Sequence, residues 1–226
     1  CNRRCEQECT RGLLDAPLAI DEIKKFIAER ELNEEERYIP LCENEEGGFY
    51  SNKMAIIGAG PVGMSAAYYL RIKGYPVTVF EKEEKPGGML RYGIPSFRLE
   101  KDVIDAEIEV LKAMGIEFRC GVEIGKDITI DGLREEGYEA IYLAIGAQGG
   151  KKLNIAGTNE EYVMTGVDFL REVNKEESKD MLSGHVVVIG GGNVAMDVAR
   201  SALRSGAASV DLFCLESEND MPASPD

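Results

Sequence analysis

The chain has 226 residues, enough for one or two domains with a buried core. Its composition is 44% hydrophobic and 30% charged, as in ordinary globular domains, and no apolar run approaches the roughly 20 residues that a membrane-spanning helix needs. The formal net charge of −15 disfavours nucleic acid and anionic membranes, so we expect neither nucleic-acid binding nor membrane insertion.

The chain opens with three evenly spaced cysteines, Cys1, Cys5 and Cys9. Six cysteines without a recognisable leader indicate a reducing compartment, so disulfides are disfavoured and a cytoplasmic location is expected. Zinc prefers paired C-x2-C hooks, whereas closely spaced thiolates suit an iron–sulfur cluster whose fourth ligand comes from elsewhere. We therefore predict these three cysteines as metal ligands, with zinc or a chance run of surface cysteines as the alternatives.

Residues 17–30 have the apolar period of an amphipathic helix. With the cysteines, this helix predicts a small helical domain over residues 1–31. The segment 32–53 is polar and acidic and contains Gly47-Gly48, so it is expected to be a linker.

Residues 54–81 read as strand, glycine turn, helix and strand. The apolar run Met54–Ile57 predicts a buried parallel strand, Pro61–Ile72 a helix, and Val77–Phe80 a second strand with Glu81 at its tip. This order within 28 residues is the fingerprint of a dinucleotide-binding unit.

The turn carries Gly58, Gly60 and Gly63 at the GxGxxG spacing, and each position has a mechanical reason. The first glycine permits the tight turn, the second lets the backbone approach a pyrophosphate, and the third lets helix and strand pack closely. The N–H groups and positive dipole end of the helix favour phosphate, and Glu81 is placed to accept a hydrogen bond from a ribose hydroxyl.

Gly87-Gly88 predicts a second close approach of backbone to a ligand, and Tyr92–Pro95 a turn. An amphipathic helix is expected over Glu100–Met114. The elements expected next are strands at Ile116–Cys120 and Ala140–Ile145 and a short helix at Val167–Val173. The second strand runs into Gly146, where a loop can again meet a cofactor.

A second dinucleotide unit follows. Its expected parts are the strand His185–Ile189, the GxGxxA turn Gly190–Ala195, the helix Met196–Ser205 and the strand Ser209–Cys214. The unit stops at Asp226, before the further strands of a Rossmann sheet, so both ends of the chain look cut.

Two such units predict two dinucleotides that meet face to face, commonly a flavin and a nicotinamide. The protein then supplies orientation and electrostatics, so we expect no catalytic acid–base residue. No C-x2-C stands near either unit, which disfavours a redox-active disulfide of the thioredoxin reductase kind.

Six segments, in order along the chain, carry a resemblance to a known family: CEQECTRG at Cys5–Gly12, PLAIDEIKKFI, GAGPVGMSAA, PGGMLRYGIPSFRL, GGGNVAMDVAR and MPAS at Met221–Ser224. The chain resembles the small (β) subunit of NAD(P)H-dependent glutamate synthase and its relatives. These include the N-terminal half of dihydropyrimidine dehydrogenase and bifurcating ferredoxin–nicotinamide transhydrogenases.

The resemblance implies an α/β protein with two Rossmann-like domains preceded by a helical [4Fe-4S] domain. The FAD domain would begin over residues 54–183, and the inserted NAD(P)H domain over 184–226, incomplete at its C-terminus. FAD would be held by Gly58, Gly60, Pro61, Gly63, Glu81, Lys82, Gly87, Gly88, Met89 and Arg98, with Val62 and Gly146 predicted alongside them. The nicotinamide nucleotide would be held by Gly190, Gly192, Asn193, Val194 and Ala195.

Two details of this resemblance are open. Arg98 has an alternative role as a surface arginine that caps the next helix. Family members also carry further cysteines upstream of the Cys1 position, so the number of clusters is not determined.

The function implied is electron transfer from NAD(P)H through FAD and iron–sulfur clusters to a redox partner. That partner would be another subunit or fused domain, such as a glutamate synthase large subunit, a ferredoxin or a dehydrogenase. The alternative is a non-catalytic nucleotide-binding or assembly module of a larger redox complex.

The coenzyme is predicted to be NAD(H) rather than NADP(H). NADPH-using relatives carry two basic residues shortly before the Met-Pro, where this chain has Leu215-Glu216, and no Lys or Arg follows Arg204. A 2′-phosphate would meet Glu216, Glu218 and Asp220, whereas a carboxylate accepts from a ribose 2′-OH. The alternative is that Glu216 points to solvent and a basic residue from outside this stretch binds the phosphate.

Overall fold

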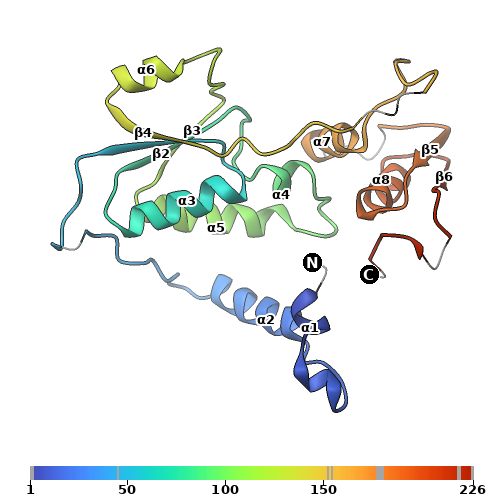
Figure 1. Ribbon diagram of the computed structural model, residues 1–226, viewed down its shortest axis with the longest axis horizontal. Coiled ribbons are helices and arrows are strands. Elements are labelled where there is room, and N and C mark those ends of the chain that lie inside the picture. Colours follow the sequence, from blue (N-terminus) through green and yellow to red (C-terminus); the bar gives the residue numbers. More distant parts are fainter. Residues whose placement is uncertain are drawn as a thin grey trace. The chain divides into compact units, whose positions relative to one another are not determined.

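The computed structural model describes residues 3–44, 46–151, 153, 155–176, 181–217 and 220–224. The chain divides into two compact units, Cys1–Ile39 and Pro40–Pro225 (Figure 1). Within the described residues, no helix combines the length and the apolar character required to cross a bilayer.

The first unit consists of short helices joined by polar contacts. They are α1 (Arg4–Gln7), a 3-10 turn (Thr10–Leu13) and α2 (Ile20–Leu32). The carboxylate of Glu6 accepts the N–H of Asp21 at 2.9 Å, which satisfies one free donor of the first turn of α2. None of the described residues of this unit is buried, so these polar contacts, rather than an apolar core, hold its helices together.

The second unit begins earlier than the sequence predicted. Glu43 N–H donates to the carbonyl of Ile72 at 3.3 Å, and Tyr50 N–H donates to the carbonyl of Gly74 at 3.0 Å. The rings of Tyr50 and Tyr75 stack with centroids 4.4 Å apart. Glu43 and Tyr50, which belong to the segment expected to be linker, therefore pack against the end of α3 (Pro61–Ile72) and the turn that follows it.

A four-stranded parallel sheet forms the first half of this unit, in the order β3-β2-β1-β4. Its strands are β1 (Lys53–Ile57), β2 (Val77–Glu81), β3 (Glu117–Cys120) and β4 (Tyr138–Leu143). The order 3-2-1-4 is that of the Rossmann fold, as the glycine pattern predicted.

Helices cover both faces of this sheet, because alternate residues of each strand point to opposite sides. Figure 1 shows α3 and α5 (Lys101–Ala113) on one face and α6 (Ile130–Glu135) on the other. Ile56 and Val79 belong to the core with α3, whereas Phe80 packs with Leu133 of α6.

Three parts of this half differ from the sequence prediction. Two helices were not predicted: α4 (Met89–Tyr92), which ends at the first residue of the predicted turn, and α6. β4 runs two residues earlier than expected because its pairing partner β1 ends at Ile57, which is opposite Leu143. Beyond this point Gly58 turns toward α3, so no neighbouring strand continues the ladder.

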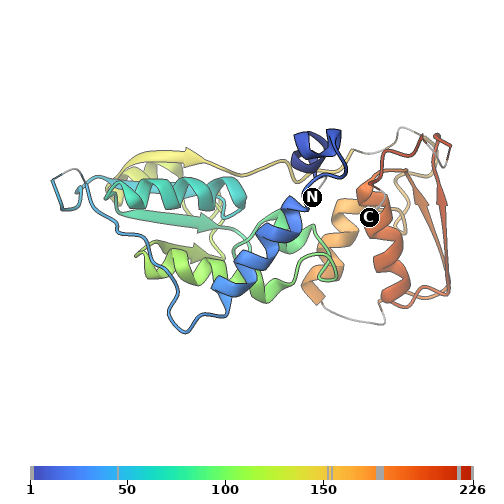
Figure 2. The ribbon, with the colours of Figure 1, turned by 90° about the horizontal axis from the view of Figure 1, so that it is seen from below.

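The second half repeats the strand–helix–strand pattern. It contains α7 (Gly166–Glu176), β5 (His185–Ile189), α8 (Asn193–Arg204) and β6 (Ser209–Phe213), and β5 pairs with β6 in parallel. Figure 2 shows α7 and α8 together on one side of the two strands. Phe169 and Leu170 of α7 share a core with Val188 of β5 and Val198 of α8. Helix α8 begins three residues before the predicted start because the turn passes directly into the helix.

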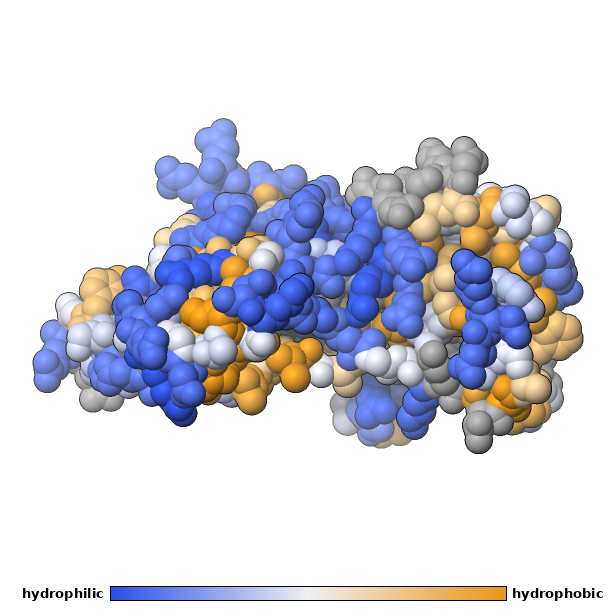
Figure 3. All heavy atoms as spheres, turned by 90° about the horizontal axis from the view of Figure 1, so that it is seen from above, coloured by the Kyte–Doolittle hydropathy of each residue, from blue (hydrophilic) through white to orange (hydrophobic). Residues whose placement is uncertain are grey.

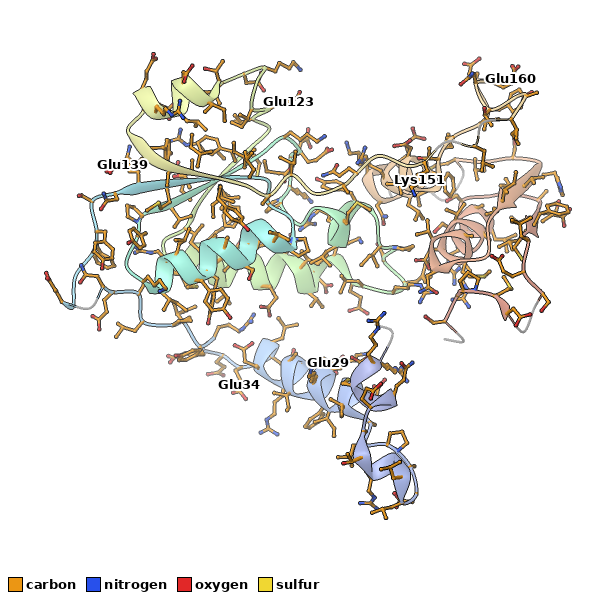
Figure 4. All side chains as sticks on the ribbon, in the orientation of Figure 1. Glu29, Glu34, Glu123, Glu139, Lys151 and Glu160 are labelled. Carbon is orange, nitrogen blue, oxygen red and sulfur yellow. The ribbon has the colours of Figure 1, made fainter. Side chains whose placement is uncertain are left out.

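The acidic side chains lie mainly on the surface. Figure 3 shows a face covered largely by hydrophilic residues, with apolar patches between them. In Figure 4, Glu123 and Glu160 project away from the ribbon, and both are exposed. The negative charge of the chain is therefore solvated at these positions.

Candidate dinucleotide-binding sites

Two of the three glycines in the first turn are required by the fold itself. Gly58 has φ +106°, and its N–H donates to the carbonyl of Phe80 at 2.7 Å. A Cβ on Gly58 would lie 2.4 Å from the carbonyl oxygen of Ala144, and one on Gly63 would lie 1.9 Å from the carbonyl oxygen of Gly58. These glycines therefore allow the turn and the close helix–strand packing that the spacing predicted.

At Gly60, by contrast, no packing contact requires a glycine. Its φ of −78° suits any residue, and a Cβ there would have as its nearest neighbour the Cα of Gly88, 3.9 Å away. It is the N-cap of α3, no side chain caps this helix end, and Pro61 occupies the first turn. Val62, next in that turn, is 58% exposed. The first N–H groups of α3 therefore adjoin free space, as an anion site requires.

A second glycine loop stacks on the first. Gly87 N–H donates to the carbonyl of Ala59 at 2.8 Å. Gly88 has φ +52°, and a Cβ there would lie 2.7 Å from the Cα of Gly60. Met89 then begins α4. The structure thus brings the two predicted glycine segments into one cradle.

A buried arginine, Arg91, stabilises the second glycine loop, and the sequence analysis did not predict this role. Arg91 is 5% exposed, and its Nε donates to the carbonyl of Pro86 at 2.6 Å. Its Nη2 forms an ion pair with Asp105 of α5. No feature of the sequence predicts this pairing, because Asp105 lies 14 residues away on another helix.

Glu81 lies at the tip of β2 and is only 6% exposed. One carboxylate oxygen accepts the N–H of Ala59 at 2.8 Å and the other accepts the N–H of Glu83 at 3.0 Å. A carboxylate oxygen has lone pairs for a further bond, so this geometry is compatible with a ribose hydroxyl as an additional donor. The neighbouring Lys82 is exposed.

The structure places Arg98 against the second Rossmann unit. Its Nε forms an ion pair with Asp197 of α8, and the two side chains are 31% and 13% exposed. The sequence predicted a contact with FAD for Arg98, and no sequence feature indicated Asp197 as its partner. Gly146 follows β4 with φ +69°, and no atom lies within 4 Å of a Cβ built on it.

The glycine turn of the second Rossmann unit, between β5 and α8, resembles the first glycine turn in its backbone conformation. Gly190 has φ +140°, and its N–H donates to the carbonyl of Phe213 at 2.8 Å. Gly192 is the N-cap of α8 with φ −92°, and nothing lies within 4 Å of a Cβ built there. Gly192 thus corresponds to Gly60, and the N-terminus of α8 is a second open helix end.

The closing MPAS segment lies across this second turn. Asn193 Oδ1 accepts the N–H of Ser224 at 2.7 Å, and Ala223 N–H donates to the carbonyl of Gly191 at 3.1 Å. Val194, in the first turn of α8, is 51% exposed. The methyl group of Ala195 lies 3.5 Å from a Cβ built on Gly190, so the small third residue of GxGxxA packs closely against the turn.

Glu216 lies beside the second turn. It is exposed, and its Oε2 lies 3.3 Å from a Cβ built on Gly191. Glu218 lies outside the described residues, and the side chain of Asp220 accepts from Ser217 at 2.6 Å. The structure thus places a carboxylate at the predicted specificity position.

The cysteine cluster is described only in part, because Cys1 lies outside the described residues. Cys5 is exposed and Cys9 is half-buried. Backbone N–H groups of Leu18, Arg11 and Gly12 donate to the Cys9 thiol and lower its pKa. Among the described residues, no three metal-binding side chains converge, so the predicted ligand set, which includes Cys1, stays a prediction.

Comparison with known proteins identifies the family. The model of the pyridine nucleotide-disulphide oxidoreductase family matches residues 52–218, which include both glycine turns. The chain belongs to this family. This family match confirms the expected Rossmann-like α/β fold.

Alignments with individual relatives cover more of the chain than the family model does. The chain is 41% identical over 242 residues to the NADP(+)-dependent formate dehydrogenase subunit beta of Moorella thermoacetica, covering 99% of this chain and 34% of that protein. It is 38% identical over 220 residues to the NAD-dependent dihydropyrimidine dehydrogenase subunit PreT of Escherichia coli O157:H7, covering 97% of this chain and 52% of that protein. The chain thus spans between a third and about half of these relatives.

A solved structure supports the same assignment. Mycobacterium tuberculosis FprA in complex with NADPH matches with a TM-score of 0.62 and 25% identity, over 77% of this chain and 46% of that one. The dihydropyrimidine dehydrogenase part of the predicted resemblance is confirmed by PreT. The glutamate synthase part is named by neither relative described above and stays a prediction.

Proposed function

We propose that this chain binds FAD at its first glycine cradle and NAD(P)H at its second turn, and passes electrons between them and a redox partner. The observation that carries this proposal is the pair of open helix ends at Gly60 and Gly192. Both glycines have ordinary backbone angles and no packing reason to lack a side chain. A pyrophosphate that approaches the backbone accounts for both of them.

The residues of the first cradle suit FAD. The stacked pair Gly60 and Gly88 offers backbone to a pyrophosphate, and Glu81 is the carboxylate for the adenosine ribose. Met89 and Lys82 flank the loop, and Arg98 is proposed to contribute a positive charge beside it. With both nucleotides bound, the chemistry supplied is hydride transfer from NAD(P)H to FAD, whose two electrons then leave toward a partner.

The cysteine segment is proposed to hold a [4Fe-4S] cluster through Cys1, Cys5 and Cys9. The N–H groups directed at the Cys9 sulfur support this role, since they stabilise a thiolate, which is the form that ligates iron. A reducing, cytoplasmic location is proposed as well, because thiols persist there without forming disulfides. Iron with acid-labile sulfide in anaerobically purified protein is the expected result, and stoichiometric zinc without sulfide would contradict it.

We propose NAD(H) as the coenzyme. A 2′-phosphate near Glu216 would bring like charges together at a cost of about 1–3 kcal/mol in a partly solvated site. The relatives are named for either coenzyme, one for NADP(+) and one for NAD, so the choice rests on this carboxylate. A higher kcat/KM for NADPH than for NADH would refute it.

A partner subunit or fused domain is proposed as the electron acceptor or donor, because the relatives are named as subunits of formate and dihydropyrimidine dehydrogenases. The deciding experiment is the visible spectrum of anaerobically purified full-length protein. Flavin bands that bleach on addition of NADH or NADPH support the proposal. A colourless protein that takes up neither FAD nor iron would instead indicate a non-catalytic assembly module.

A further inference from the structure

The end of helix α7 contacts the segment that carries the second glycine loop. Lys175 Nζ lies 2.6 Å from Oε2 of Glu83 and 5.6 Å from the centroid of the Tyr92 ring. Asn174 Nδ2 donates to the carbonyl of Tyr92 at 3.2 Å. We refer to Asn174 and Lys175 as the α7 clamp.

The clamp holds residues on both sides of Gly87-Gly88. Glu83 precedes the loop, and its N–H donates to the carboxylate of Glu81 at 3.0 Å. Tyr92 follows the loop, and its hydroxyl donates to the carbonyl of Lys85 at 3.1 Å. The clamp is therefore attached to the flavin cradle through two short, hydrogen-bonded connections.

On its other side, α7 packs directly against α8. Leu170 and Val198 lie in one buried core. A Cβ built on Gly166 of α7 would lie 3.1 Å from Cγ2 of Val198 and 3.3 Å from Cγ1 of Val194. Val194 is in the first turn of α8, at the proposed nicotinamide nucleotide site. Packed side chains thus connect the α7 clamp to both sites.

The clamp is polar and only partly shielded. The side chain of Glu83 is 16% exposed and that of Lys175 is 44% exposed. Interfaces of this kind between domains permit relative motion unless specific contacts select one arrangement. Hydride transfer requires the two rings in contact at a defined angle, so the contacts that select the arrangement govern its rate.

We propose that the α7 clamp sets the orientation of the nicotinamide unit over the flavin unit, so that Asn174 and Lys175 are positioning residues for hydride transfer. This inference rests on the proposed function of the two sites. The Arg98–Asp197 pair joins the same two units through α8 and involves neither clamp residue. Clamp variants should therefore misorient the units without separating them.

The test is a charge-swap cycle in full-length protein, made of Lys175→Glu, Glu83→Lys and the double variant. The readouts are bound FAD per protein, the KM for NADH, and the limiting rate of flavin reduction in stopped flow at saturating NADH. Since small misplacements of reacting groups cost one to two orders of magnitude, each single variant should reduce the limiting rate about tenfold, with FAD content and KM little changed. The double variant should recover most of the rate.

Two further variants sharpen the result. Lys126→Glu is the matched control, because Lys126 is 76% exposed and its ion pair with Glu123 lies within one loop and does not join the two Rossmann units. Its rate should equal that of the wild type. Asn174→Ala removes a clamp contact without a charge change and should also slow reduction, which keeps the test decisive if Lys175→Glu does not fold.

Three outcomes would overturn the inference. These are single variants that reduce flavin at the wild-type rate, a double variant no faster than the singles, and single variants that lose FAD, which would make the clamp a support of the flavin loop alone. A wild-type protein that neither NADH nor NADPH reduces would instead refute the proposed function and remove the basis of both.

Discussion

Replacing Gly60 with alanine separates the binding role of this residue from the fold. The new methyl group would have no neighbour closer than 3.9 Å, so the folded chain accommodates it. Alanine is a poorer N-cap than glycine, whereas it reduces the entropy of the unfolded chain, and the two effects of up to about 1 kcal/mol oppose each other. We expect the free energy of unfolding of Gly60→Ala to stay within about 1 kcal/mol of the wild type.

The effect on FAD should be much larger. The methyl group would occupy the space through which a phosphate approaches the N–H groups of α3. Loss of one or two charge-assisted hydrogen bonds, at about 1.5–3 kcal/mol each, suggests a net loss of about 2–4 kcal/mol. That corresponds to a roughly 30- to 1,000-fold increase in the Kd for FAD.

The measurement is a titration of apoprotein with FAD, followed by quenching of flavin fluorescence, together with thermal unfolding of the apoprotein. Gly192→Ala is the matched control, because its Cβ position is equally open but lies in the second turn. It should bind FAD normally and bind NAD(H) weakly. Gly63→Ala provides the contrast, since its Cβ would lie 1.9 Å from the carbonyl oxygen of Gly58 and must destabilise the fold.

The reasoning would be refuted if Gly60→Ala bound FAD with the wild-type Kd. It would also be refuted if Gly60→Ala and Gly192→Ala weakened both nucleotides equally, because the two helix ends would then not be separate sites.

The remaining predictions concern the cysteines, the coenzyme and Arg98. In cluster-free protein, alkylation of Cys9 should reach half its maximal rate at a lower pH than alkylation of Cys42. Backbone N–H donors, chiefly that of Leu18, lower the pKa of Cys9, whereas burial raises the pKa of Cys42. The reverse order would contradict the Cys9 geometry. Cys9→Ser should abolish acid-labile sulfide and leave FAD content intact, whereas unchanged sulfide would exclude Cys9 as a ligand. Glu216→Lys should raise the ratio of kcat/KM for NADPH over NADH by about ten- to a hundredfold, and an unchanged ratio would show that Glu216 points away from the ribose. Arg98→Ala should lower the flavin content, while unchanged flavin would mean that Arg98 serves only its pair with Asp197.

Much of the nucleotide-binding framework could be predicted from the sequence because its signals are local. Gly58 and Gly190 adopt positive φ, which glycine tolerates and other residues rarely adopt. Pro61 occupies the first turn of α3, where its missing N–H costs nothing. These signals lie within a few residues of the turns that they specify, so the predicted bounds of α3 and β5 agree with the structure.

The boundaries of other elements depended on partners distant in the chain. β4 ends at Leu143 because β1 offers no residue beyond Ile57, although apolar residues continue after it. α4 was missed because a four-residue helix leaves too short a pattern to detect, and packing against α5 and α7 stabilises it.

Side-chain partners were decided only by the tertiary structure. Arg98 lies in a motif that suggests flavin contact, yet it pairs with Asp197, 99 residues away in α8. The α7 clamp likewise joins Lys175 to Glu83 across the two Rossmann units. A sequence motif specifies backbone geometry through local sterics, whereas the partner of a long charged side chain depends on which surfaces meet after folding. For this reason the sequence by itself determined the two nucleotide turns, and the folded chain determined how they are joined.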